Sequence, residues 1–265
     1  MVSKPAVRAW RPGLPGVAEV LHAHYRQHAY PPHTHSSWTL LILDDGVVRF
    51  DLERHEHGTL GSQVVLLPPH VPHDGRAASP QGFRKRVLYL DEPVLDPNLI
   101  GVAADRPNLP DPVLWDRISR LHTVLARPGD DLETQSRLAL IVERVGDHLR
   151  RGRTRPRPGP DRGLADQLRE LLDARVVPGL PLDEAARLLH AHPVHLIRSF
   201  TRRFSLPPHR YLTGRRVDLA RQLLLSGRPP ADVATAVGFH DQSHLTRHFR
   251  RMLGVSPAHY AKNRR

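Results

Sequence analysis

The chain has 265 residues, which is long enough for two domains that each bury a core of their own. It contains no cysteine, which excludes disulfides, thiolate metal sites and cysteine catalysis. Its 39 basic and 27 acidic residues give a net charge of +12. No apolar run approaches the ~20 residues of a membrane span and no signal-peptide core begins the chain, so we expect a cytoplasmic protein without membrane contact.

The region up to Asp96 contains short β-like runs separated by turn residues. Three candidate strands are Trp38–Leu43, Val47–Asp51 and Gln63–Leu67. Between the first two, Asp44-Asp45-Gly46 is typical of a hairpin turn. Several short strands at this spacing predict a small β-barrel or jelly roll, which we expect over residues 1–110.

Two amphipathic helices are expected in residues 111–149, separated by a break at residues 127–130. The apolar stripe of the first comprises Val113, Leu114, Ile118, Leu121, Val124 and Leu125. The stripe of the second comprises Leu138, Ile141, Val142, Val145 and Leu149. Such stripes are buried, either against the β domain of the same chain or in an interface between two copies.

Residues 150–163 are rich in Arg, Pro and Gly and contain no apolar side chain to bury. This composition predicts an exposed linker before a C-terminal domain at residues 164–265. A solvated tether is the favoured role for the linker, and contact of its arginines with phosphate is the alternative.

The C-terminal region contains one pattern twice. When residues 183–211 are laid over residues 232–260, nine identical pairs align: Asp183/Asp232, Ala185/Ala234, His195/His244, Leu196/Leu245, Arg198/Arg247, Phe200/Phe249, Arg202/Arg251, Pro208/Pro257 and Tyr211/Tyr260. A repeat of this length indicates one supersecondary unit used twice.

Each copy predicts a helix, a tight turn and a second helix. The expected helices are Leu182–Leu189 and Pro193–Phe204 in the first copy, and Pro230–Val237 and Gln242–Met252 in the second. In the second copy, Gly238 suits a turn that needs a positive φ, and Asp241 is a typical helix N-cap. A further helix over Pro207–Ser226 is expected to connect the two copies rigidly.

The second helix of each copy has one apolar face, made of Leu196 and Phe200 or of Leu245 and Phe249. The opposite face carries side chains that read base edges or hold phosphates. They are Val194, His195, Arg198, Ser199 and Arg202 in the first copy, and Gln242, Ser243, His244, Arg247, His248 and Arg251 in the second. From residue 150 onward the chain has 23 basic and 9 acidic residues. This excess favours nucleic-acid binding over an ordinary solvated helical surface.

Residues 182–260 resemble the DNA-binding domain of the AraC/XylS family of bacterial transcription regulators, and the resemblance extends over residues 164–262. Its most specific part is the second copy, VATAVGFHDQSHLTRHFRRMLGVSPAHY. It implies a seven-helix domain with two helix-turn-helix units. The implied base readers are Val194, His195 and Arg198 in the first unit, and Gln242, Ser243, His244 and Arg247 in the second. The first turn, His190-Ala191-His192, lacks the glycine that is usual there.

Residues 31–76 resemble the cupin-like effector-binding domain that precedes such DNA-binding domains. In cupins, an HxH pair and a later histidine can hold a metal. Here His33, His35 and His73 fit that pattern, because side chains two apart in a strand point to the same side. The implied ion is Zn, Ni or Fe. The acidic or amide ligand that follows HxH in cupins is missing, and His55 and His57 form a second pair where a turn is expected. Without a metal, His35, Trp38, Arg49 and His73 are candidates to line a pocket for a small effector.

These features predict a transcription regulator that binds double-stranded DNA, not an enzyme: a cupin-like barrel and two helices, then an all-α domain with two helix-turn-helix motifs. The family resemblance implies a homodimer, a small-molecule effector and RNA polymerase as partners. A cupin metalloenzyme with a DNA-binding appendage is the second hypothesis. A non-specific basic nucleoid protein is the third, and it would bind any duplex equally.

Overall fold

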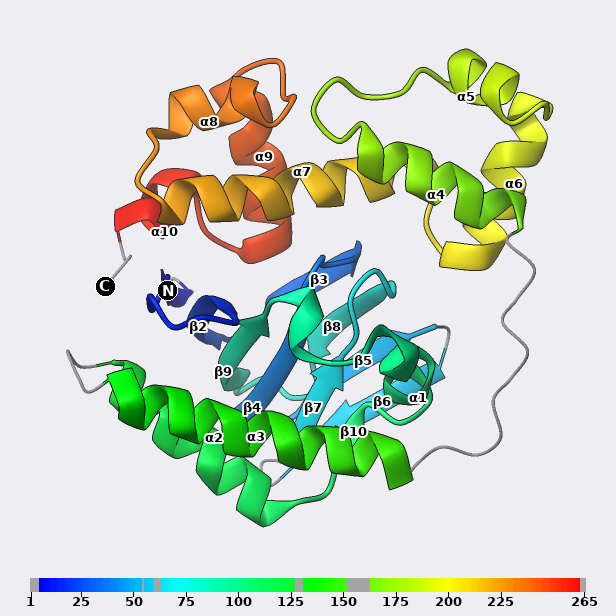
Figure 1. Cartoon of the computed structure of the whole chain (residues 1–265). Coiled ribbons are helices and arrows are strands. Elements are labelled where there is room, and N and C mark those ends of the chain that lie inside the picture. The colour runs from blue at the N-terminus through cyan, green and yellow to red at the C-terminus, as the bar shows by residue number, and fades with distance from the viewer. Residues whose placement is uncertain (1–4, 54, 60–62, 127–130, 152–162, 263–265) are drawn as a thin grey trace.

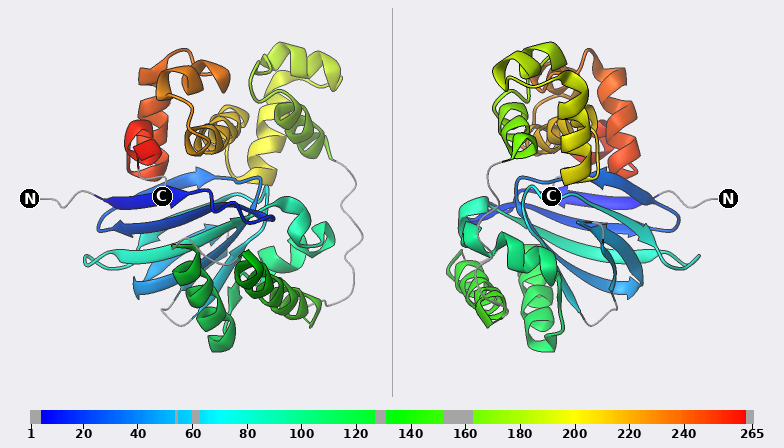
Figure 2. Two further views of the ribbon diagram at one scale, coloured as in Figure 1. Left: turned by 60° about the vertical axis from the view of Figure 1, so that its left-hand side comes forward. Right: turned by 90° about the vertical axis from the view of Figure 1, so that its right-hand side faces the viewer.

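The computed structural model describes residues 5–53, 55–59, 63–126, 131–151 and 163–262. It consists of a β-rich N-terminal half and a helical C-terminal half that is docked against one side of the strands (Figure 1). In both views of Figure 2, the strands lie between the C-terminal helices and the pair α2 and α3. This arrangement confirms the predicted fold class.

Two antiparallel sheets form the N-terminal half. The six-stranded sheet has the order β1 (Ala6–Trp10), β2 (Val17–Tyr25), β9 (Phe83–Leu90), β4 (Trp38–Gly46), β7 (Val64–Leu67), β10 (Asn108–Leu109). The four-stranded sheet has the order β3 (Ala29–His33), β8 (His73–Ala77), β5 (Val48–Leu52), β6 (His55–Thr59). The three predicted strands correspond to β4, β5 and β7.

The predicted hairpin at Asp44-Asp45-Gly46 is wrong. Strand β4 pairs with β7 and β9, whereas β5 pairs with β6 and β8 in the other sheet. These three residues are the end of β4, and the chain passes to the other sheet at Val47. The turn expected at His55 and His57 is also wrong, because both residues lie in strand β6.

The helices η1 (Glu92–Val94), η2 (Pro97–Leu99) and α1 (Ile100–Asp105) follow the strands and lead to α2 (Pro112–Leu125) and α3 (Asp131–Arg151). The break predicted at residues 127–130 lies outside the described residues. Most residues of the two apolar stripes are buried against the outer face of the six-stranded sheet. They belong to one cluster with Leu40, and they include Leu114, Ile118, Ile141 and Val145. The stripes thus pack on their own barrel, and the dimer interface stays a prediction.

Seven helices make up the described part of the C-terminal half, as the family resemblance implies. They are α4 (Leu164–Ala174), α5 (Leu182–Leu188), α6 (Pro193–Phe204), α7 (Pro208–Leu225), α8 (Pro230–Ala236), α9 (Gln242–Leu253) and α10 (Pro257–Lys262). Most of the predicted linker, residues 152–162, lies outside the described residues, and Arg150 and Arg151 still belong to α3.

The turns of the two helix-turn-helix units differ by one residue in the distance from the positive-φ residue to the N-cap of the second helix. In the second unit Gly238 has φ +87 and Asp241 caps α9 by accepting a hydrogen bond from the His244 backbone N–H. In the first unit His190 adopts the left-handed conformation, with φ 47, and His192 is already the N-cap of α6. The missing glycine is therefore replaced by a histidine, which tolerates a positive φ at some cost in strain.

One apolar core crosses the boundary between the halves. Leu41, Phe50 and Phe83 from inside the barrel belong to the same buried cluster as Val217 of α7 and Phe249 of α9. The first helix-turn-helix unit has a separate core, which contains Leu168, Leu196, Phe200, Phe204 and Tyr211. The second unit is thus built onto the barrel, and the first is attached to it mainly through α7.

Asp111 joins α2 to α3 and provides a test of this packing. Its carboxylate is 4% exposed, accepts the Leu114 backbone N–H at 3.0 Å and pairs with Arg144 and with His148 Nε2 at 2.6 Å. Burial alone would raise the pKa of Asp111, but the hydrogen bonds from Arg144 and His148 outweigh it and lower the pKa.

We predict that Asp111→Ala lowers the free energy of unfolding by about 2–3 kcal/mol, measured by urea denaturation at pH 7, because the cap and both charged partners are lost. Asp116→Ala is the control, because its pair with Arg120 is exposed, and it should cost less than about 0.5 kcal/mol. Since the folded-state pKa of Asp111 is lowered, its contribution is present above the unfolded-state pKa, near pH 4, and is lost as the pH falls below it. Equal stability of the two variants at pH 7 would contradict this role.

Candidate ligand pocket and nucleic-acid interface

A cavity of about 60 Å³ lies inside the barrel, on the side that faces the C-terminal half. Its walls are mostly apolar side chains from both sheets, including Leu41, Phe50 and Phe83. On the open side the lining residues come from α7 and α9: Gly214, Val217, Asp218, Arg221, Met252 and Leu253. A molecule in this cavity would therefore contact both halves of the protein.

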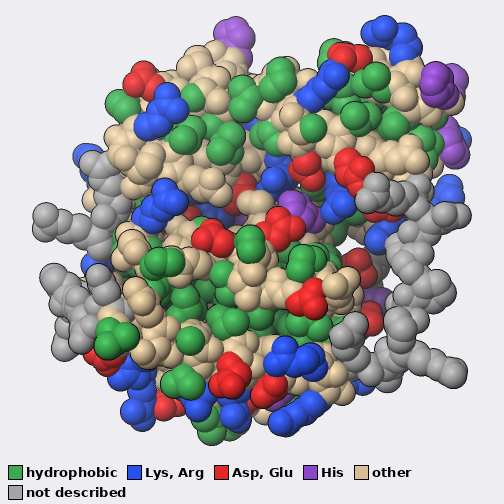
Figure 3. Space-filling model, viewed as in Figure 1, with side chains coloured by type: hydrophobic (Ala, Val, Ile, Leu, Met, Phe, Trp, Pro, Cys, Tyr) green, Lys and Arg blue, Asp and Glu red, His purple; other side chains and the backbone are tan. Residues whose placement is uncertain are grey.

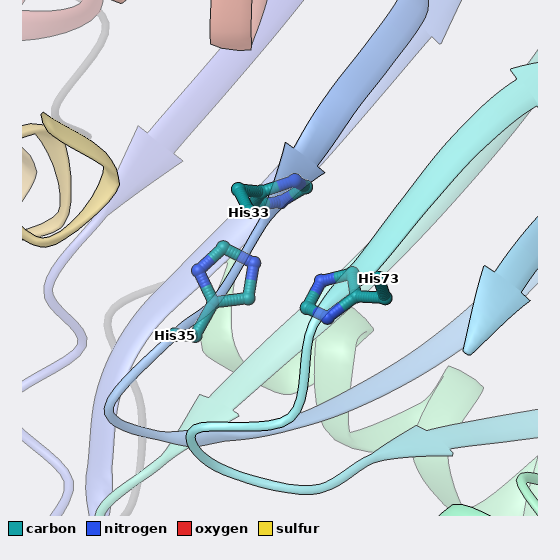
Figure 4. A group of neighbouring side chains, drawn as sticks. All are labelled: His33, His35 and His73. Carbon is teal, nitrogen blue, oxygen red and sulfur yellow. The ribbon is translucent and has the colours of Figure 1, made fainter. Parts of the chain in front are cut away.

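Three histidines meet at the edge of this cavity. His33 ends β3, His35 lies in the segment between β3 and β4, and His73 begins β8 (Figure 4). One ring nitrogen from each lies within 4.8 Å of the others, and the three side chains are 5–7% exposed. The sequence prediction that His33, His35 and His73 converge is confirmed, although only His33 and His73 lie in strands.

The histidines are held in the neutral form. Burial, followed by the neighbouring imidazoles, lowers the pKa of His33 well below its usual range, and burial and His35 lower the pKa of His73 to about 3. Burial also lowers the pKa of His35, although Asp218 opposes the shift. Neutral imidazoles have a free nitrogen lone pair at pH 7, which is the form that binds a metal ion.

Two of the four predicted pocket residues lie elsewhere. His35 and His73 line the cavity, but Trp38 and Arg49 do not. Trp38 points to the other side of β4, where it packs in the core beneath α2 and α3, because Thr39 and Leu41 take the cavity side of the strand. Arg49 is exposed and pairs with Glu56 at 3.6 Å, since Val48 and Phe50 are the inward residues of β5.

Sequence reasoning missed a buried ionic network between the halves. Arg221 of α7 donates to Glu19 of β2 at 2.6 Å and to the Tyr260 hydroxyl at 3.1 Å. Asp218 accepts hydrogen bonds from the Ser36 backbone N–H at 3.2 Å and from the Ser36 hydroxyl at 2.8 Å. Arg221, Glu19 and Asp218 are 3–7% exposed. Their signal in the sequence was weak but present: Asp218 and Arg221 interrupt the apolar side of α7 at helical spacing.

Lys85 is a second cavity residue that the sequence did not suggest. Its amine lies 4.2 Å above the Tyr30 ring and, in the described part of the chain, has no carboxylate within ion-pair distance. Burial, and then the positive charge of Arg221, lowers the pKa of Lys85 to about 7. Charged side chains also gather along the visible junction of the halves in Figure 3.

The predicted base-reading residues lie on helices whose opposite face is fully buried. Leu196, Phe200, Leu245 and Phe249 are each 0% exposed. Among the predicted readers, Ser199 and His244 are half-buried, and the others are exposed: Val194, His195, Arg198, Arg202, Gln242, Ser243, Arg247 and Arg251. Their contact with DNA remains a prediction.

None of the helices in the described part of the chain has the length and apolar character that a membrane span requires.

Two family models match the chain. The AraC-like ligand binding domain matches residues 15–142, and a helix-turn-helix domain matches residues 185–263. Together they account for most of the chain, in the order in which the structure places the barrel and the two helix-turn-helix units.

The chain is also similar to individual proteins described as transcriptional regulators. The chain is 36% identical over 76 residues to the uncharacterized HTH-type transcriptional regulator YbfI of Bacillus subtilis, a match that spans 29% of this chain and only 28% of YbfI. It is 22% identical over 236 residues to YobQ of the same organism, described in the same terms, covering 87% of this chain and 88% of YobQ.

Among solved structures, ToxT of Vibrio cholerae with a bound unsaturated fatty acid has the same fold. Its TM-score is 0.58 at 12% identity, covering 98% of this chain and 95% of ToxT. The fold is thus shared with ToxT, and the two family models together lead to one conclusion: this chain belongs to the AraC/XylS family of bacterial transcription regulators.

Proposed function

We propose that this protein is a sequence-specific, DNA-binding transcription regulator whose barrel cavity binds a small effector. The observation that carries the proposal is the position of the cavity, which is lined by the barrel on one side and by α7 and α9 of the DNA-binding half on the other. An effector could thereby change the position of α9, the second predicted reading helix, relative to α6. No catalytic step is part of this proposal.

The DNA-reading role rests on two similar helices with exposed basic faces. Arg198 and Arg247 occupy equivalent positions on α6 and α9, both are exposed, and both helices are anchored by a leucine and a phenylalanine. An arginine on such a helix can donate two hydrogen bonds to a guanine edge in the major groove. Two readers linked by the rigid helix α7 would recognise two neighbouring segments of one site.

The homodimer and contact with RNA polymerase are finer proposals. Val113 of α2 and Leu140 of α3 are large apolar residues that are 51% and 47% exposed. Two copies joined through this surface would place four reading helices on two half-sites. A monomer by light scattering at micromolar concentration would remove the dimer from the proposal.

We also propose that His33, His35 and His73 can bind a divalent metal ion such as Zn, Ni or Fe. His33 Nδ1 lies 2.8 Å from the Pro31 carbonyl oxygen and His73 Nδ1 lies 3.0 Å from that of Val71. A carbonyl oxygen only accepts, so each Nδ1 carries the proton and each Nε2 keeps its lone pair. The three neutral donors fit a metal ion, which would supply an open coordination position facing the cavity.

The metalloenzyme reading has less support than the regulator reading. Ser36 and Ser37 stand where cupins place an acidic or amide ligand, and Ser36 is engaged with Asp218 of the other half. Residues of α7 and α9 line the cavity, so a substrate would have to fit a space of about 60 Å³ beside the DNA-binding half. These features favour a bound ion or effector over a substrate that is turned over.

The first prediction concerns DNA reading. Arg198→Ala and Arg247→Ala should each weaken binding to a duplex selected by the wild-type protein from a random library, by about 1–3 kcal/mol, as measured by fluorescence anisotropy. Arg120→Ala, which removes an exposed arginine of α2, is the control and should leave the affinity nearly unchanged. Unchanged binding by both reading variants would contradict the assigned faces, and equal binding to random duplexes would favour a nucleoid protein.

The second prediction concerns the metal. Purified protein titrated with Zn²⁺ against a chromophoric chelator should bind one equivalent, and His33→Ala should bind at least about 100-fold more weakly because one of three ligands is lost. His55→Ala changes an exposed histidine of β6 and serves as the control. Stoichiometric binding that survives in His33→Ala would place the ion elsewhere.

The third prediction concerns Lys85, whose buried amine lacks an anionic partner. Lys85→Met should raise the free energy of unfolding at pH 7, because an uncompensated cation is removed from an apolar cavity. Between about pH 7 and pH 10 the unfolded chain holds the Lys85 proton and the folded chain releases it, so wild-type stability rises with pH in this window. In chelator-treated protein, the advantage of the variant should therefore shrink by about 3 kcal/mol from pH 7 to pH 9.5. A constant advantage would show that the amine reaches solvent.

A further inference from the structure

The three histidines differ in what holds their second ring nitrogen. His33 and His73 donate from Nδ1 to backbone carbonyls of their own segments, Pro31 and Val71. The Nδ1 of His35 is buried and has no hydrogen-bond partner among the residues that the structure describes. The acceptor in front of it is the carboxylate of Asp218, with Oδ1 3.7 Å from His35 Nδ1, and this residue belongs to α7 in the other half.

Asp218 is well placed to act as that acceptor. Its Oδ2 is held by both the backbone N–H and the hydroxyl of Ser36 and lies 3.3 Å from Arg215 Nη1. Its Oδ1 lies 3.5 Å from Arg221 Nη1. The group is therefore a fixed carboxylate that faces His35.

From this geometry we propose that Asp218 is the outer partner of a metal-loaded histidine site, and that metal binding draws α7 of the DNA-binding half against the barrel. A metal ion on His35 Nε2 fixes the proton on Nδ1 and makes that N–H a stronger donor. Closing the gap from 3.7 Å to a hydrogen bond needs a shift of less than about 1 Å. The occupancy of the site would then be communicated across the interface by a single hydrogen bond.

The direction of the effect follows from linkage. If the hydrogen bond to Asp218 strengthens metal binding, then metal binding strengthens the contact between α7 and the barrel by the same factor. Helix α7 connects the two predicted reading helices, so this contact restricts how α6 and α9 can be arranged. This inference rests on the proposed metal site and adds its regulatory connection.

The decisive experiment compares Zn²⁺ affinity among matched carboxylate variants of the full-length protein. Asp218→Asn should bind Zn²⁺ about 10- to 100-fold more weakly than wild type, because the carboxylate partner of a ligating histidine is lost. Asp173→Asn is the control: Asp173 also pairs with Arg215, but its histidine neighbour is His70, 3.9 Å away and outside the three-histidine site. It should retain wild-type affinity.

A second readout distinguishes a regulatory contact from a merely stabilising one. Saturating Zn²⁺ should slow amide hydrogen exchange in α7 of the wild type by several fold, and should leave exchange in α7 of Asp218→Asn unchanged. If Asp218→Asn does not fold, Ser36→Ala keeps the charge, loosens its orientation, and should weaken Zn²⁺ binding by at least about threefold.

The results distinguish the existence of the metal site from the role of Asp218. Equal Zn²⁺ affinity in wild type and Asp218→Asn, or in Ser36→Ala where that variant is used, overturns the role of Asp218. It leaves the metal site standing if His33→Ala still abolishes binding. No Zn²⁺ binding by the wild type overturns both the metal site and the connection. Weaker binding without any change in α7 exchange would overturn the regulatory connection alone.

Discussion

The arrangement of the molecule depends on one buried charge, the guanidinium of Arg221. It lies between Glu19 of the barrel and Asp218 and Tyr260 of the helical half, above the face of the Tyr89 ring at 4.1 Å. Removing one partner from a buried ion pair typically costs about 3–5 kcal/mol, because the other charge stays desolvated. The halves therefore cannot separate partway: either Arg221 and Glu19 stay together inside the interface or both become hydrated.

This constraint explains why the cavity belongs to both halves. Arg221 and Asp218 hold α7 across the open side of the barrel, and Val217, next to Asp218 in the chain, contributes to the apolar wall. The Tyr25 hydroxyl adds a hydrogen bond of 2.9 Å to the Leu253 carbonyl oxygen at the end of α9. The second helix-turn-helix unit is thereby fixed to the barrel, while the first keeps its own core. A change in the cavity would act on the angle between the units.

The sequence predicted local features well, because they depend on near neighbours. The boundaries of α6, the cap at Asp241 and the turn at Gly238 follow from propensities within a few residues. The sheet assignment of β4 and β5 did not follow, because a turn motif does not specify which strands pair on either side of it. Trp38 was placed on the wrong side for a related reason: alternation identifies two faces of a strand but not which one is the cavity. The pairing of Arg221 with Glu19 joins residues 202 apart, beyond the reach of any local pattern.

The three histidines show the same difference between local features and long-range contacts. The HxH pattern and the later histidine were visible in the sequence, and so was their convergence. What the sequence could not show is that two of the three rings are oriented by their own backbone and the third faces the other half. A site whose outer partners all lay within the barrel would be insulated from the reading helices. Here His35 faces Asp218 on α7, which connects the two predicted reading helices, so the proposed metal site would share a contact with the docking of the two halves.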